Sequence, residues 1–394
     1  MHIRRSHALG WVGGAAGVAV AGIAAAAALA GPGGAAAPPA FAPIGTYATG
    51  LTGGTSAETS ALEGRRLYVT NSTGNSLDIV DVRDPAAPAL VKRVDLSPWG
   101  AGPNSVDAED GLVAVAMEAS PKTAPGRVVF LRSDGTHVAD VGVGALPDML
   151  TFDDGGRQVI VANEGEPSGY GSADAADPEG SISIISTKDI GRRPPAVRTV
   201  SFAAFNAGGA RHGELPAGIR LNGPGASVAQ DLEPEYVTVT EKGRTAHVTL
   251  QEANAVAEID LRRARVTRIV ALGTKDHSLP GMGLDPSDRD NANLIGTWPV
   301  RGMYMPDAIA HFSVRGRDYL ITANEGDGRD WPGFADEARV STLALDPTAF
   351  PGATALKASS ALGRLTVSRT DGLAADGEYE ALYSFGARSA TIWG

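Results

Sequence analysis

The chain contains no cysteine among its 394 residues. This absence excludes a disulfide scaffold, a zinc or iron–sulfur site held by thiolates, and a catalytic thiol. Histidine is scarce, with seven residues, and no nucleophile elbow, P-loop or H-E-x-x-H motif is present. Acidic residues outnumber basic ones, 45 to 34, so the chain lacks the positive balance expected of a nucleic-acid partner.

Long apolar runs are missing after the first thirty residues. Arg4 and Arg5 precede an apolar stretch that ends in Ala28-Leu29-Ala30, an A-x-A cleavage site. Residues 1–30 are therefore expected to be a signal peptide, followed by a flexible spacer at 31–42. The alternative is an N-terminal membrane anchor, because the run is long enough to span a bilayer. We expect a secreted or cell-surface protein with no membrane span after signal removal.

Residues 43–394 contain a repeated pattern. A short apolar strand ends in a polar residue, usually followed by Glu, five times, at 67–71, 113–118, 159–164, 247–252 and 320–325. Before four of these strands stands a proline, then a polar residue and an alternating strand: Pro103-Asn104, Pro147-Asp148, Pro234-Glu235 and Pro306-Asp307. A glycine-containing turn joins the two strands each time, which is typical of a β-hairpin.

A third strand follows the polar pair, at 76–80, 127–131, 181–185, 255–259 and 339–343, and a fourth often follows it, as at 197–200 and 266–270. Four antiparallel strands in roughly 45 residues match one blade of a β-propeller. The alternative is a β-sandwich with similar hairpins, but five ordered copies favour the propeller.

The irregular spacing of the copies indicates insertions between blades at 190–232 and 273–304. Residues 380–385 and 389–393 resemble the middle hairpin of a sixth blade. The sequence therefore predicts an all-β propeller with about seven blades if complete, and six or so here with the last one incomplete.

Several segments resemble a known family. LYVTNSTGNSLDIVD at 67–81 resembles the repeat of YVTN-type bacterial surface propellers. The whole run resembles the choice-of-anchor I family, also labelled mesenchyme-specific cell-surface glycoprotein-like, through VANEGEP (161–167), DPEGS (177–181), DLEPEY (231–236), QEANA (251–255), LDPSDRD (284–290), MPDA (305–308) and TANEGD (322–327). The resemblance implies a secreted or surface-attached propeller of about seven blades. Some relatives carry an alkaline phosphatase label, and propeller phytases share the fold.

The ends of paired strands should meet at one rim of the propeller, because neighbouring antiparallel strands reverse direction. Carboxylates gathered there repel one another unless cations or protons neutralise them. Oxygen ligands without cysteine favour Ca²⁺ or Mg²⁺ over Zn²⁺. The alternative is that these residues only satisfy loop N–H groups at strand ends. The candidate metal ligands at this rim are Asp148, Glu164, Glu235, Glu252, Asp307 and Glu325.

A second candidate calcium site lies in the later insertion. Asp285, Asp288 and Asp290 fall within six residues, although the loop lacks the glycine and the final glutamate of an EF-hand. The alternative is a solvated acidic loop.

Four further side chains are candidates for chemistry. His277 borders the acidic insertion and is a weak catalytic candidate, while Arg211, Arg301 and Arg329 could hold an anion such as phosphate. Two functions remain open: a binding or scaffold module with a Ca²⁺-binding rim, or a metal-dependent phosphoesterase that uses the same rim. The expected partner is a surface ligand or a phosphorylated small molecule, and a monomer is expected.

Overall fold

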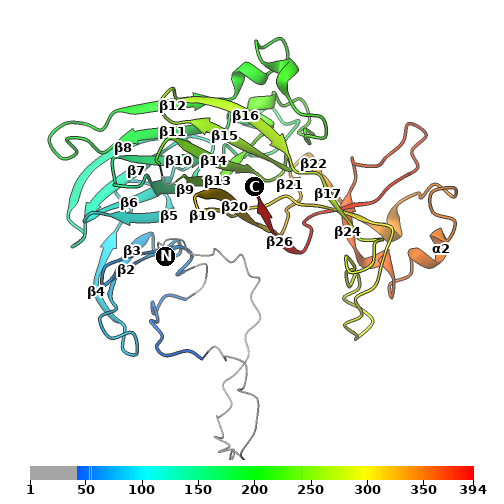
Figure 1. Ribbon diagram of the computed structural model, residues 1–394, viewed down its shortest axis with the longest axis horizontal. Helices are drawn as coiled ribbons and strands as arrows, with labels where there is room; N and C mark the ends of the chain where they lie inside the picture. Colours follow the sequence, from blue (N-terminus) through cyan, green and yellow to red (C-terminus); the bar gives the residue numbers. More distant parts are fainter. Residues whose placement is uncertain (1–41, 53, 55, 241) are drawn as a thin grey trace, which may run out of the picture.

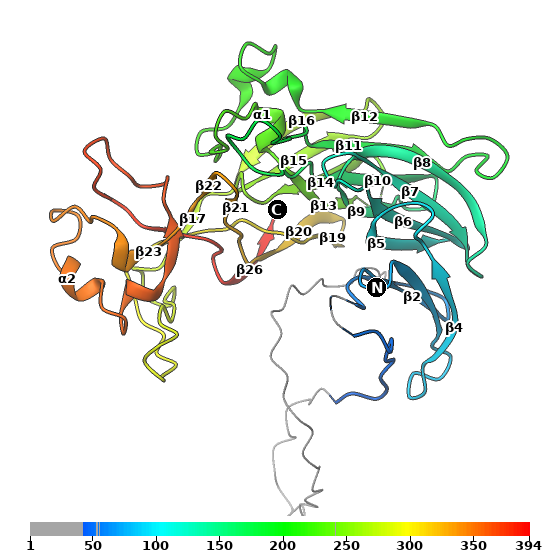
Figure 2. The same cartoon turned by 180° about the vertical axis from the view of Figure 1, so that it is seen from behind.

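The computed structural model describes residues 42–394 except 53, 55 and 241, so the expected signal peptide and nearly all of the spacer lie outside it. Within these residues five β-sheets follow one another in an arc as propeller blades (Figures 1 and 2). The α-helices of this part are two single turns, α1 (Val228–Asp231) and α2 (Ala353–Leu356). The all-β prediction is therefore confirmed. None of the described helices is long and apolar enough to cross a membrane.

Each of the first four blades is a four-stranded antiparallel sheet whose strands follow chain order. They consist of β1 (Ser60–Glu63), β2 (Arg66–Asn71), β3 (Ser76–Asp81) and β4 (Ala89–Asp95); β5 (Gly102–Glu109), β6 (Leu112–Glu118), β7 (Pro125–Arg132) and β8 (His137–Ala145); β9 (Pro147–Phe152), β10 (Gln158–Asn163), β11 (Ser181–Ser186) and β12 (Val197–Ser201); and β13 (Pro234–Val239), β14 (Thr245–Leu250), β15 (Ala255–Asp260) and β16 (Arg265–Ala271).

The fifth blade has three strands, β19 (Ile309–Val314), β20 (Arg317–Asn324) and β26 (Ser389–Trp393). β26 pairs with β20 along its whole length. The predicted third strand at 339–343 is therefore wrong, and so is a sixth-blade hairpin built from 380–385 and 389–393. Residues 325–388 are inserted between the second and third strands, so the true partner of β20 lies far along the chain.

The hairpin turns follow from their sequences. Asp110 and Gly111 have φ values of 52° and 77° and form the two-residue link between β5 and β6. Arg315 and Gly316, at 52° and 76°, do the same between β19 and β20. Left-handed residues at both positions match the twist of the flanking strands, which is the reason for the glycine.

The blades pack face to face with the proline-led strands innermost, because β1, β5, β9, β13 and β19 are in sequential contact. Cores lie between blades 1 and 2, between 2 and 3, and between 3 and 4. Val113 to Met117 on β6 are 0% exposed. Both faces of this strand are covered, so its run is apolar throughout instead of alternating.

Two insertions together build a side lobe, defined as residues 272–304 and 325–388. Its main sheet contains β17 (Thr274–Asp276), β18 (Arg301–Met303), β25 (Tyr383–Ser384), β24 (Thr366–Ser368) and β23 (Glu337–Arg339), and β21 (Asp330–Trp331) pairs with β22 (Phe334–Ala335). The lobe has its own apolar core around Val340, Phe350 and Leu362. It projects from the side of the arc at the fourth and fifth blades (Figure 1).

Candidate functional site

The ends of the inner and second strands meet at one face of the propeller, as the sequence predicts. Pro147 lies opposite Asn163, Pro234 opposite Leu250, and Gly102 opposite Glu118. The polar residues that follow these positions in the chain are therefore brought to the same face.

An unusual backbone conformation recurs just before three inner strands. Leu146, Glu233 and Met305 have φ values of 45°, 38° and 41°, and each precedes a proline and then an acid. Left-handed conformations are unfavourable for residues other than glycine, at a cost of about 1–3 kcal/mol each. The repeated kink therefore places each acid two residues later, at the start of β9 and β13 and just before β19.

Five acids at this face form a group that we call the acidic rim: Asp148, Glu164, Glu235, Glu252 and Asp307. The three glutamates are at most 8% exposed, while the two aspartates are half-buried. Burial, with added repulsion from Asp307, raises the pKa of Asp148 to about 8. Burial and neighbouring acids raise the pKa of Asp307 to about 6 and raise those of Glu164 and Glu235 as well. Burial raises the pKa of Glu252 to about 7.

Gln251 connects two members of the acidic rim across blades 4 and 5. In the amide orientation that satisfies both neighbours, its nitrogen donates to Glu235 Oε1 at 3.2 Å and its oxygen accepts from the Asp307 N–H at 3.1 Å. The other oxygen of Glu235, Oε2, and Oε2 of Glu252 are buried without a hydrogen-bond partner among the described residues. Such oxygens are costly to bury unless a proton or a cation neutralises them.

The sixth rim candidate differs from the others, because Glu325 is exposed. Within the described part of the chain, no three His, Asp or Glu side chains already surround a common point at which a metal ion could sit. The structure thus brings five predicted ligands to one face without arranging them as a preformed metal cage.

Beside the acidic rim, Arg329 is almost completely buried between Asp231, at the end of the first insertion, and Glu233, just after it. Its Nη1 lies 2.8 Å from Asp231 Oδ1, its Nη2 lies 3.0 Å from Glu233 Oε2, and it also donates to Asn222. The predicted anion-binding residue therefore neutralises buried acids of the protein itself. Glu233 keeps one oxygen, Oε1, without a hydrogen bond in the described structure.

A second buried arginine makes the reciprocal connection. Arg220, from the first insertion, reaches Asp336 and Asp371 of the side lobe, with Nε 2.6 Å from Asp371 Oδ2. Arg329 belongs to the side lobe and pairs with Asp231 and Glu233 at the end of the first insertion and just after it. Each of the two parts therefore contributes one arginine that pairs with acids of the other, and these ion pairs hold the side lobe against the propeller.

The remaining candidate residues, Arg211, Arg301 and His277, lie against other groups of the protein. Arg211 donates to Glu214 and to the carbonyls of Val266 and Thr267. Arg301 is exposed on β18, opposite Asp276 on β17.

His277 is fully buried. Its Nδ1 lies 2.6 Å from the Met282 carbonyl oxygen, and burial lowers its pKa.

The acidic loop at 285–290 organises its own backbone. Asp285 accepts from the N–H groups of Ser287 and Leu294, and Asp290 accepts from that of Ala292. Asp288 pairs with Arg364 of the side lobe at 2.8 Å. All three carboxylates thus have protein partners in the described structure, and the calcium site at this loop stays a prediction.

Sequence reasoning missed Asp231 and Glu233 as the buried partners of Arg329, although both lie in the segment DLEPEY. The capping box of Ser227 and Gln230 starts α1 and sets Asp231 at its end. The available signal was the Glu-Pro-Glu sequence, because a second acid flanks the proline only in this blade.

Comparison with known proteins places the chain in a family. The model of the choice-of-anchor I domain matches residues 59–394. No curated protein matches.

Solved structures similar to this chain include one from a nidogen/laminin complex (16% identity, 56% of this chain, 64% of that chain, TM-score 0.34). Others are the Kuenenia stuttgartiensis hydrazine synthase (13%, 67%, 79%, 0.35) and the Cps50 (Swd1) β-propeller domain of Myceliophteria thermophila (7%, 67%, 64%, 0.40). This chain spans less than two thirds of the first and third of these chains. On the evidence of the family model, the protein belongs to the choice-of-anchor I domain family.

Proposed function

We propose that this protein is an exported binding module of the cell surface whose acidic rim takes a cationic ligand, with Ca²⁺ as the specific candidate. The observation that carries the proposal is the set of buried, unpartnered carboxylate oxygens on Glu235 and Glu252. A bound cation would supply the missing partner and displace the protons that otherwise neutralise these groups. The family and the expected signal peptide support export.

The phosphoesterase alternative draws no support from two of its three candidate arginines. Arg329 is committed to Asp231 and Glu233, and Arg211 to Glu214 and two carbonyls. A phosphate next to the acidic rim would have to compete with these partners. Binding is therefore the function that the geometry favours.

The test is thermal melting at pH 8 with and without CaCl₂, for the wild type and for Glu235→Gln. At a Ca²⁺ concentration of about 100 times Kd, binding to the folded state adds about 2.7 kcal/mol of stability. We expect the wild type to gain melting temperature and Glu235→Gln to gain little. Glu380→Gln removes an exposed carboxylate of the side lobe and serves as the matched control. Equal gains in all three proteins, or none in the wild type, would contradict the proposal.

A further inference from the structure

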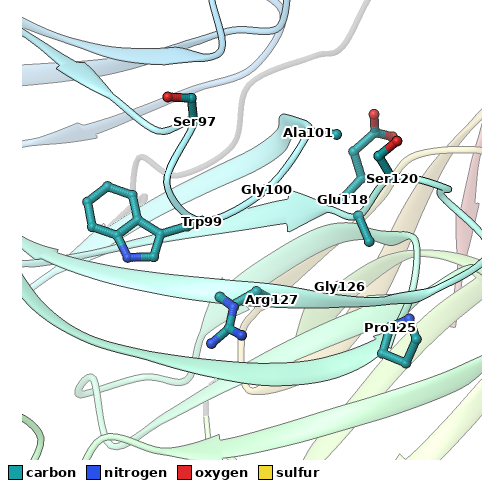
Figure 3. A pocket seen from close by; sticks show the side chains of 10 residues that line it. Ser97, Trp99, Gly100, Ala101, Glu118, Ser120, Pro125, Gly126 and Arg127 are labelled. Atoms are coloured by element: carbon teal, nitrogen blue, oxygen red, sulfur yellow. The ribbon is translucent and has the colours of Figure 1, made fainter.

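A separate pocket lies at the junction of the first two blades. The crossing segment from β4 to β5 and the turn between β6 and β7 border an open pocket of about 360 Å³, a size suited to a small molecule. Figure 3 shows Trp99 and Glu118 on opposite sides of this pocket, with Arg127 on β7 lower in the view. None of these residues belongs to the acidic rim.

The lining of the pocket carries one acidic and one basic side chain. Glu118 and Arg127 are the charged side chains among the residues that line it. Glu118 is half-buried, and its carbonyl accepts from the Ala101 N–H at 2.8 Å, whereas its carboxylate has no hydrogen bond among the described residues. Burial raises the pKa of this carboxylate, and the charge of Lys122 opposes that shift. A positively charged group placed against this carboxylate would offset the cost of its burial.

Arg127 is held in place from the other side. One of its terminal nitrogens donates to Asp140, and Asp140 also lies 3.2 Å from His137 Nε2. The His137 ring stacks on Trp99 with a centroid distance of 4.9 Å. This chain of contacts fixes both the guanidinium and the indole, and only one of the five N–H donors of the guanidinium is taken up by Asp140. The free donors suit a carboxylate.

We propose that this pocket binds a small zwitterion of the amino-acid class, with its ammonium group on Glu118, its carboxylate on Arg127 and its carbon chain against Trp99 and Pro125. Opposite charges on a preformed site favour a ligand that carries both signs, because a ligand of one charge leaves the other protein group unpaired. The apolar contact with the indole adds affinity and selects for an alkyl body. This proposal is independent of cation binding at the acidic rim.

The experiment is calorimetric titration of the full chain with 6-aminohexanoate, hexylamine and hexanoate, which share a carbon chain and differ in their charged ends. Because a hydrogen bond to a charged group contributes about 1.5–3 kcal/mol, we expect 6-aminohexanoate or a shorter ω-amino acid to bind at least about tenfold more tightly than either analogue. The series from 3-aminopropanoate to 6-aminohexanoate should show one preferred length. Equal affinities for the amine and the zwitterion, or no saturable binding by any member of the series, would overturn the proposal.

Two variants and two matched controls assign the site. Glu118→Gln and Arg127→Gln should each weaken binding of the preferred zwitterion at least about tenfold, because each removes one charged contact. Arg132→Gln alters the exposed arginine at the far end of β7, and Glu380→Gln alters an exposed acid of the side lobe. Both controls should bind as the wild type does. Equal weakening in the controls, or none in Glu118→Gln, would place any binding elsewhere.

Glu235→Gln separates this proposal from the previous one. It should retain zwitterion binding while losing the Ca²⁺ effect. A Glu235→Gln protein that loses zwitterion binding would overturn the assignment to this pocket.

Discussion

Replacement of Arg329 by Gln should destabilise the protein strongly. The side chain is 1% exposed and is paired with Asp231 and Glu233, which are 4% and 2% exposed. Its removal leaves two carboxylates without their cation in a region that water does not reach. Breaking a buried ion pair in this way costs about 3–5 kcal/mol.

The size of the effect can be followed by thermal melting. The shift in Tm is about 2–4 °C per kcal/mol for a domain of 150–250 residues and smaller for this larger one, so the loss corresponds to a fall of roughly 5 °C or more. Arg301→Gln, an exposed arginine of the same lobe, should change stability by less than about 0.5 kcal/mol. The double variant Arg329→Gln/Glu233→Gln should recover part of the loss, because one of the two orphaned charges is removed with its partner.

The loss should also depend on pH. At pH 5 the orphaned acids can take up protons at little cost in free energy. At pH 8 they must either stay charged in a buried site or bind protons far above the usual carboxyl pKa, and both cost more. We therefore expect a smaller difference between Arg329→Gln and the wild type at pH 5 than at pH 8. A Tm fall no larger than that of Arg301→Gln at either pH would refute the stabilising role of the buried ion pairs of Arg329.

Three other outcomes are expected. Wild-type stability without added cation should fall as the pH rises from about 5 to 9 in a melting series. The pKa values of Asp148 (about 8) and Glu252 (about 7) in the folded protein lie above the usual carboxyl range, so the folded state binds more protons than the unfolded state there. A rise in stability across that range would contradict the burial of these acids. Gly386→Ala should destabilise far more than Gly64→Ala, since a Cβ at 386 would lie 1.7 Å from the Glu325 carbonyl oxygen while one at 64 meets nothing within 4 Å; equal urea midpoints would argue against the close approach. Trp393→Ala should cost about 1–3 kcal/mol in urea unfolding, because it removes a half-buried indole and its 2.9 Å hydrogen bond to the Thr322 hydroxyl; an unchanged midpoint would contradict the role of β26 in the fifth blade.

The sequence predicted the blade pattern well, because each strand is short, alternating or wholly apolar, and bounded by turn residues. Pro147-Asp148 and Pro234-Glu235 were correctly placed at the start of inner strands. The third strand of the fifth blade was missed for a topological reason. Its partner β26 follows a long insertion, and local pattern at 339–343 could not reveal that the chain leaves the blade and returns.

The sequence predicted the face on which the candidate acids lie, but it did not predict which of them form ion pairs. Recurrent acids at strand ends indicated one shared face, and the register confirms it. Which acids are neutralised depends on contacts such as Arg329 with Glu233, which are remote in sequence and appear only when two insertions pack together. Trp99 carried no signal, since a single aromatic residue in a crossing segment is ordinary.

The central claim is that the acidic rim exchanges protons for a cation, and calorimetric titration with Ca²⁺ at pH 7 in two buffers of different ionisation enthalpy tests it most directly. We predict saturable binding whose heat differs between the buffers, because protons leave Asp148 and Glu252 as the cation enters, and whose difference shrinks in Glu252→Gln. Absence of binding, or binding with the same heat in both buffers, would contradict the account.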